Sequence, residues 1–168
     1  MKRVLIMVVL VVMSYVLQST ALHNIALAKT IPNLLLIIVV SHGYMRGSTR
    51  AMFLGLFTGL LVDCQYGDII GFHAFLYMLI GYLTGLGHKI YYQEDFTMPI
   101  LLVAISDFVY NLLFYFFSFL LRNRTDFFFY LKRIIIPELI YTVLVSILFY
   151  KLLHMIYLRL ENSEKKEA

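Results

Sequence analysis

The stretch that decides the fold is GLFTGLLVDCQYGDIIG, residues 55–71. Small residues and one carboxylate recur there at intervals of four, at Gly55, Gly59, Asp63, Gly67 and Gly71. Residues four apart lie along one side of a helix, so the spacing predicts a ridge of small residues. From position 63 the sequence turns polar, as DCQYGD, which is typical of a helix end. We therefore expect two antiparallel helices joined by a tight turn.

Four residues are expected to shape this turn. Asp63 ends the first of the two helices, and Gly67 supplies a backbone position with a positive φ angle. Asp68 can cap the helix that follows, and Gly71 completes the turn. We interpret Asp63 as a residue that fixes the turn, and not as a catalyst.

The composition is that of a protein covered by lipid. The chain has 168 residues, of which 61% are hydrophobic and only 14% are charged. A soluble domain carries about 45–50% apolar and about 25% charged residues. So small a chain cannot bury this excess, so we predict an integral membrane protein. The net charge of +4 is spread over termini and loops, which gives no basic stripe for a nucleic acid.

The apolar segments predict an all-α, six-helix transmembrane bundle that forms one domain over residues 1–160. A helix needs about 20 apolar residues to cross a bilayer. The predicted spans are residues 4–22, 31–45, 51–66, 69–91, 98–121 and 134–158, of which the second and third are short. Residues 161–168 form a polar C-terminal tail. The distribution of Lys and Arg favours both termini in the cytoplasm.

The connection before the last span has an open interpretation. Residues 122–136, RNRTDFFFYLKRIII, are basic at both ends and aromatic in the middle. They fit either a short amphipathic helix at the membrane surface or an ordinary loop with anchoring residues. Pro137 and Glu138 are expected in the first turn of the last span, where a proline breaks no hydrogen bond and a carboxylate complements the helix dipole.

Two G-x-x-x-G motifs predict close helix packing. They are formed by Gly55 with Gly59 and by Gly81 with Gly85. Helices associate in lipid mainly through close backbone contact, which small residues allow. The motifs indicate either packing inside the bundle or a docking face for another membrane protein, and the spacing fits both.

A polar cluster is predicted within the fifth span. Asp107 lies deep in this span, and Asn111 follows four residues later on the same helix face. An ionisable group inside the bilayer is costly and needs a reason. Neighbours and candidate partners of this pair are Ser106, Tyr110, His42 and His73. Three interpretations stay open, namely a structural network, a ligand or proton site, and a partner contact.

The sequence lacks the motifs that would predict catalysis. Asp63 and Asp107 do not match the Y-D and G-x-G-D pattern of intramembrane aspartic proteases, because Gln65 stands where the second motif needs a glycine. Zinc, nucleotide and serine-nucleophile motifs are also missing. Cys64 is the single cysteine, so an internal disulfide is excluded. We expect neither an enzyme nor a bound cofactor or metal.

Residues 32–85 resemble the rod shape-determining protein MreD family of bacteria. Their sequence is PNLLLIIVVSHGYMRGSTRAMFLGLFTGLLVDCQYGDIIGFHAFLYMLIGYLTG. The family pattern is a proline, a run G-x-x-x-D-x-x-x-G-x-x-x-G and a set of aromatic and small residues. Its positions here are Pro32; Gly59, Asp63, Gly67 and Gly71; and Tyr77, Gly81 and Tyr82. The size, the N-terminal MKR helix and Pro137 also fit this family.

The resemblance implies a non-enzymatic scaffold of bacterial cell elongation in the cytoplasmic membrane. Such proteins bind the bitopic membrane protein MreC, and indirectly the actin-like MreB filament and the wall synthase, a glycosyltransferase–transpeptidase pair. The fold is similar to the substrate-binding subunits of energy-coupling-factor transporters. The alternative function is therefore a small-molecule-binding subunit of a transporter. The first span lacks the A-x-x-x-A docking motif of those subunits, which counts against this alternative.

Overall fold

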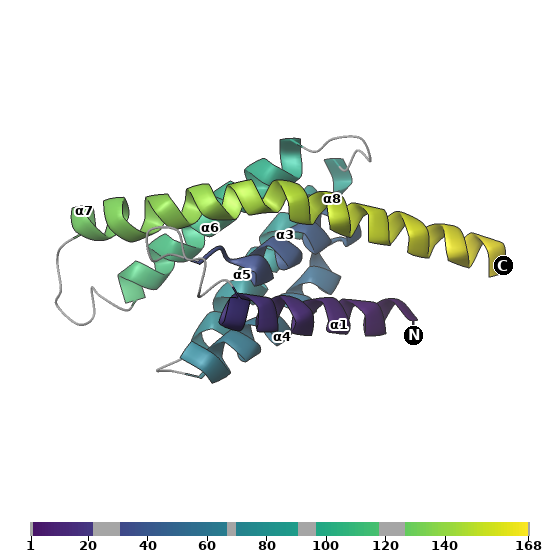
Figure 1. Ribbon diagram of the computed structural model, residues 1–168, viewed down its shortest axis with the longest axis horizontal. Coiled ribbons are helices and arrows are strands. Elements are labelled where there is room, and N and C mark those ends of the chain that lie inside the picture. Colours follow the sequence, from purple (N-terminus) through teal and green to yellow (C-terminus); the bar gives the residue numbers. More distant parts are fainter. Residues whose placement is uncertain (1, 22–30, 67–69, 91–96, 118–126, 168) are drawn as a thin grey trace.

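The computed structural model describes residues 2–21, 31–66, 70–90, 97–117 and 127–167 (Figure 1). Within these ranges every regular element is helical and no strand occurs, which confirms the all-α prediction. The helices are α1 (Lys2–Val16), α3 (Leu34–Arg46), α4 (Ser48–Tyr66), α5 (Phe72–Leu86), α6 (Thr97–Tyr115), α7 (Phe127–Tyr130) and α8 (Ile136–Glu167). Leu17–Ala21 and Leu131–Ile135 are π turns, and Gly87–Ile90 is a 3₁₀ turn.

The last helix departs from the sequence-based expectation. α7, the π turn Leu131–Ile135 and α8 form one unbroken helical run, which continues through the polar tail to Glu167. Pro137 and Glu138 lie in the first turn of α8, as expected, but a π turn leads directly into this first turn. A proline inside a helix lacks an N–H donor and crowds the carbonyl four residues earlier. The π turn directly before Pro137 loosens the helix at this point.

Helix lengths and composition agree with a membrane protein. Among the described residues, Thr97–Tyr115 and Phe128–Ile156 are long and apolar enough to cross a bilayer, with mean hydropathies of 1.7 and 1.9. Leu5–Thr20, Leu34–Arg46 and Phe72–Leu86 are shorter apolar helices. These helices also expose large apolar side chains, such as Leu5 on α1, Leu101 on α6 and Leu148 on α8. Lipid is the environment that suits such a surface.

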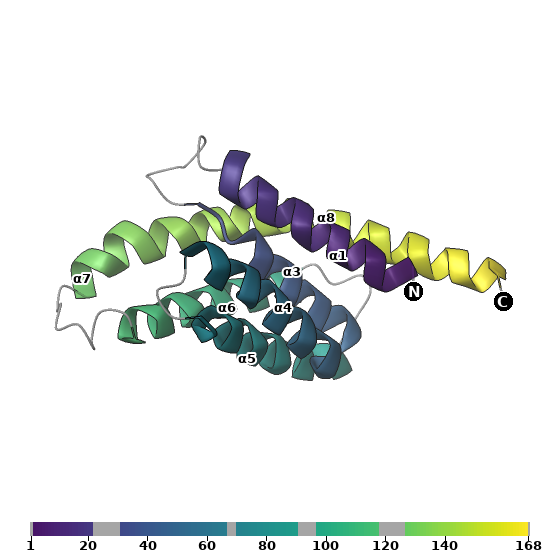
Figure 2. The ribbon, with the colours of Figure 1, turned by 90° about the horizontal axis from the view of Figure 1, so that it is seen from below.

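Helix α3 forms the core of the bundle. It packs against α1, α4, α5, α6 and α8, and Figure 2 shows it between the α1–α8 side and the α4–α5 side. Its sequence LLLIIVV, residues 34–40, is apolar on all faces, and a helix of this kind is expected to be buried. Thirteen residues span only about 20 Å at 1.5 Å per residue. α3 is therefore shorter than the membrane interior, and its first turn, next to Asn33, is buried in protein.

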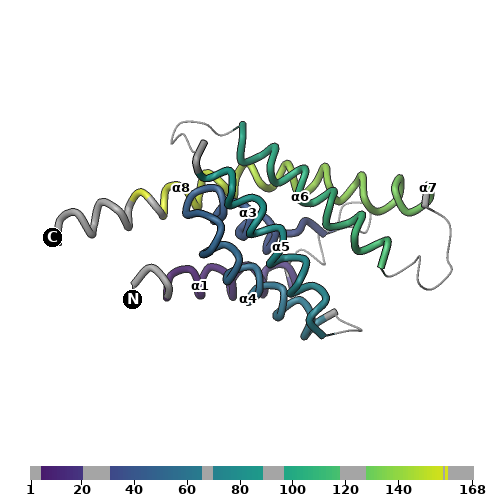
Figure 3. The backbone as a smooth tube through the Cα atoms, turned by 180° about the vertical axis from the view of Figure 1, so that it is seen from behind, coloured from purple at the N-terminus to yellow at the C-terminus, as the bar shows by residue number. Residues whose placement is uncertain are grey.

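The closest packing in the bundle joins α4 and α5. These helices follow each other along the chain, and the tube in Figure 3 shows them side by side along their length. Both expose apolar side chains on the outside, including Phe53 on α4 and Phe75 on α5. The residues on their inner faces form the first part of the candidate site.

Candidate functional site

The glycines of α4 lie directly against the backbone of α5. A Cβ atom added to Gly55 would overlap the carbonyl group of Tyr77. One added to Gly59 would overlap the backbone of Ala74. Both overlaps are with main-chain atoms, which cannot turn aside as a flexible side chain can. Glycine is therefore required at both positions for α4 to approach α5 this closely.

The glycines of α5 make the reciprocal contacts. A Cβ on Gly81 would meet the Ala51 carbonyl, and one on Gly85 would meet the backbone of Ser48. The two G-x-x-x-G motifs thus face each other in a single seam between α4 and α5. The structure places all four glycines inside the chain's own packing, and none of them lines an open groove for a second protein.

Asp63 caps the N-terminus of α5 from the preceding helix. Its buried carboxylate accepts hydrogen bonds from the backbone N–H groups of Gly71 (2.9 Å), His73 (2.9 Å) and Ala74 (3.0 Å). These N–H groups belong to the first turn, where a helix has no internal acceptors and favours a negative charge. One carboxylate thus joins the end of α4 to the start of α5.

Two of the four expected turn residues, Asp63 and Gly71, shape the described part of the turn, in roles that differ from those expected. The positive φ angle observed is that of Gly71, at +99°. The carboxylate that caps α5 is Asp63, whereas the sequence indicated Asp68 for this role. Gly67 and Asp68 lie outside the described residues. Standard capping patterns span about three residues. Asp63 and Gly71 are eight residues apart, so the sequence pattern does not identify this cap.

A polar network crosses the interior through Asn33, which caps α3. The Asn33 Oδ1 atom accepts a bond from the Leu36 N–H (3.2 Å) and a second from the Tyr77 hydroxyl (2.6 Å). The Asn33 N–H donates to the Thr142 hydroxyl oxygen on α8 (3.2 Å). Three helices, α3, α5 and α8, are therefore joined at one buried asparagine.

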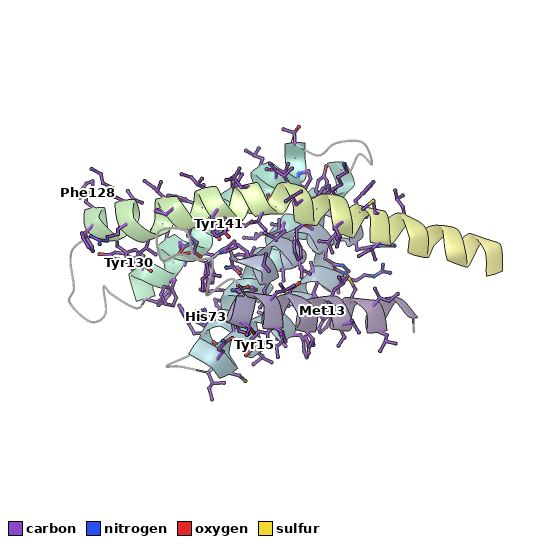
Figure 4. The ribbon with its side chains drawn as sticks, in the orientation of Figure 1. Met13, Tyr15, His73, Phe128, Tyr130 and Tyr141 are labelled. Atoms are coloured by element: carbon purple, nitrogen blue, oxygen red, sulfur yellow. The ribbon has the colours of Figure 1, made fainter. Side chains whose placement is uncertain are left out.

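A second branch joins α5 to α6. The Tyr110 hydroxyl and the His73 Nδ1 atom lie 3.0 Å apart in a hydrogen bond. The Tyr110 ring also meets the Tyr77 ring edge to face, with centroids 5.4 Å apart. Figure 4 shows His73 near the end of the bundle where α5 begins. Two histidines were considered as partners. His73 joins this branch, whereas the charges that act on His42 are those of Arg46 and Arg50.

Asp107 and Asn111 lie on the buried face of α6 that meets α8. The Asn111 side chain donates to the Asp107 backbone carbonyl (3.1 Å) and also faces Glu138. The Asp107 carboxyl is fully buried, and neither of its oxygens has a hydrogen-bond partner. The Thr142 hydroxyl lies near it, at a geometry that falls short of a normal hydrogen bond. The sequence placed Glu138 in the first turn of the last helix, as observed, but did not indicate that this turn faces α6.

Replacing Tyr77 with phenylalanine tests the network at Asn33. The change removes one buried hydrogen bond and leaves the ring contact with Tyr110 in place. We expect the unfolding free energy in detergent to fall by about 1–2 kcal/mol, because Asn33 then loses its strongest partner. Tyr82→Phe is the matched control, since Tyr82 lies on the exposed side of the same helix. Equal stabilities of the two variants would contradict a role for the network.

The arrangement offers no catalytic constellation within the described ranges. The Asp63 carboxylate is engaged by three N–H groups, whereas the Asp107 carboxyl faces Glu138 and Thr142. The two aspartates thus have separate surroundings. Among the residues that the structure describes, no group of three or more His, Cys, Asp or Glu side chains could hold a metal ion. The geometry instead holds helices together.

A family model described as rod shape-determining protein MreD matches residues 1–160. The chain belongs to the MreD family. The match confirms the family resemblance, which covers nearly the whole chain. Membership assigns the chain to rod shape determination, and the family is one of shape-determining structural proteins.

No curated protein and no solved structure matches the chain. The similarity of its fold to transporter substrate-binding subunits therefore stays a prediction. In this MreD chain, the stretch that carried the family resemblance forms the glycine seam and the Asp63 cap. The family pattern thus falls on the contacts that join α4 to α5.

Proposed function

We propose that this MreD-family chain is a non-enzymatic, multi-pass scaffold of the rod complex in the bacterial cytoplasmic membrane. In this role it binds an MreC-like bitopic protein and helps to couple the actin-like MreB filament to the wall synthase. The observation that carries the proposal is the family match over residues 1–160. The polar interior supports it, because Asn33, Tyr77 and Thr142 are used in mutual hydrogen bonds that hold the bundle together.

The proposed docking face is the outer side of α4. Its exposed large side chains are Phe53, Leu56, Phe57 and Leu60, which follow the i, i+3, i+4, i+7 spacing of a helix-binding stripe. α4 is 19 residues long but is not among the helices apolar enough to count as candidate spans. A helix of this composition gains from a protein neighbour on its exposed side. The single span of an MreC-like protein is the occupant that the family role suggests.

Disulfide crosslinking tests this face. In a Cys64→Ala background, Phe57→Cys is combined with single cysteines placed along the span of a co-expressed MreC-like protein. We expect crosslinks that repeat with a helical period along that span, because two packed helices face each other only every third or fourth residue. Leu144→Cys is the matched control, since Leu144 is exposed on α8. Crosslinks from Leu144→Cys alone would contradict the α4 face, and failure of the two proteins to co-purify would contradict the scaffold role itself.

A further inference from the structure

Two carboxyl groups, those of Asp107 and Glu138, lie where α6 packs against α8 and act on each other electrostatically. Asp107 is completely buried, and neither carboxyl oxygen has a hydrogen-bond partner. Glu138 on α8 exerts a charge effect on it, and the Thr142 hydroxyl lies near it. Glu138 is itself partly exposed and faces the Asn111 side chain. A buried polar group with no partner is rare in a folded protein, because its desolvation is not compensated.

The surroundings of Asp107 provide no positive charge. On α5 and α6 the titratable groups near it are the hydroxyls of Tyr77 and Tyr110. No lysine, arginine or histidine among the described residues exerts a charge effect on Asp107. Burying an ionised carboxylate without a partner is costly because it loses its hydration, and a second carboxylate beside it adds repulsion. A positively charged species is therefore needed to offset the burial of Asp107 and its repulsion from Glu138.

We propose that Asp107 and Glu138 form a binding site for one proton. The Asp107 carboxylate takes up the proton to become a neutral carboxylic acid, and no other bond is formed or broken. The neutral acid then has an O–H group to donate, and Glu138 and Thr142 are the acceptors beside it. A proton needs no cavity and no set of converging ligands. Asn111, on the same face of α6, donates to the Asp107 backbone carbonyl and faces Glu138.

The site makes the contact between α6 and α8 dependent on pH. The folded bundle keeps the proton, whereas water solvates the carboxylate in the unfolded chain. Stability from this group is therefore greatest at acid pH, where both states hold the proton, and it declines as the pH rises until the proton leaves the bundle. Loss of the proton places two like charges between α6 and α8, and we expect the helices to separate there first.

Labelling with dicyclohexylcarbodiimide tests the proposal on the full chain in lipid nanodiscs. This apolar reagent modifies protonated carboxyl groups within membranes, and peptide mass spectrometry locates the adduct. We expect an adduct on Asp107 at neutral pH that disappears at alkaline pH. Asp63 is the internal control, because three N–H groups engage its buried carboxylate and it is expected to stay unlabelled. An unlabelled Asp107, or labelling independent of pH, would overturn the proposal.

Two further measurements distinguish a bound proton from a bound metal cation and from a carboxyl that does not titrate. Sodium chloride in place of choline chloride at constant pH should leave the labelling unchanged, and protection by sodium would overturn the proposal in favour of a metal cation. Asp107→Asn keeps the shape of a neutral carboxyl and cannot ionise in either state, so its melting temperature should lack the decline with rising pH and should equal or exceed that of the native chain at neutral pH. The proposal would also be overturned if the melting temperature of Asp107→Asn kept the full decline with rising pH and Glu138→Gln behaved like the native chain.

Discussion

Replacing Gly59 with leucine is expected to prevent α4 from packing on α5. A Cβ atom at this position overlaps the backbone of Ala74, and the larger leucine side chain extends the overlap. Leucine favours a helix over glycine by about 0.8 kcal/mol, which is a small gain. Overpacking usually costs about 1–3 kcal/mol when neighbouring side chains can move, and here the neighbour is backbone. The overlap therefore outweighs the gain, and the helices must separate along the whole seam.

Thermal unfolding in detergent, read out by circular dichroism and size-exclusion chromatography, measures this effect. We expect Gly59→Leu to aggregate or to melt far below the native chain. Gly87→Ala is the matched control, because a Cβ at Gly87 meets only side-chain atoms of Leu102 and Tyr44, at 3.8 and 3.9 Å. A native melting temperature in Gly59→Leu would show that the seam is not essential to the fold.

Replacing Asp63 with alanine is expected to have the second largest effect. The change leaves three backbone N–H groups without their acceptor, and those of His73 and Ala74 are buried. A buried donor without a partner costs about 1–3 kcal/mol, so the two buried groups together cost about 2–6 kcal/mol. Loss of the negative charge from the start of α5 adds a smaller cost. This sum is a large share of the about 5–15 kcal/mol that keeps a typical protein folded.

Asp63→Asn provides a graded comparison for this prediction. Asparagine keeps the size of the side chain and one acceptor oxygen, but it replaces the other oxygen with an N–H₂ group. We expect a stability between those of Asp63→Ala and the native chain in detergent denaturation, and hydrogen exchange that is fastest at the amides of His73 and Ala74. Protection of these amides in Asp63→Ala at native levels would contradict the cap.

The glycine motifs show how far a local pattern reaches. The spacing of Gly55, Gly59, Gly81 and Gly85 predicts that backbones approach closely at these positions. It leaves the identity of the second backbone open, because a helix of the same chain and a helix of a partner present the same surface. The structure decides this point by placing the glycines of α4 and α5 against each other.

The polar residues show the same limit. Asp107 and Asn111 share a face because both belong to one helix, and their spacing alone establishes this. Glu138 belongs to a helix about 30 residues further along the chain, and its pairing with Asp107 depends on how α8 packs on α6. The sequence placed Glu138 correctly in the first turn of the last helix, but it did not show which neighbouring helix this turn faces.

The amino-acid sequence by itself determined the lipid-covered class, the all-helical fold, the approximate helix positions and the MreD family. These properties depend on composition and on spacing within one helix, which neighbouring residues establish locally. Only the tertiary structure decided that the glycine seam is internal, that Asp63 caps α5 and that Asp107 meets Glu138. Each of these contacts joins residues on different helices, and their distance depends on how the whole bundle packs.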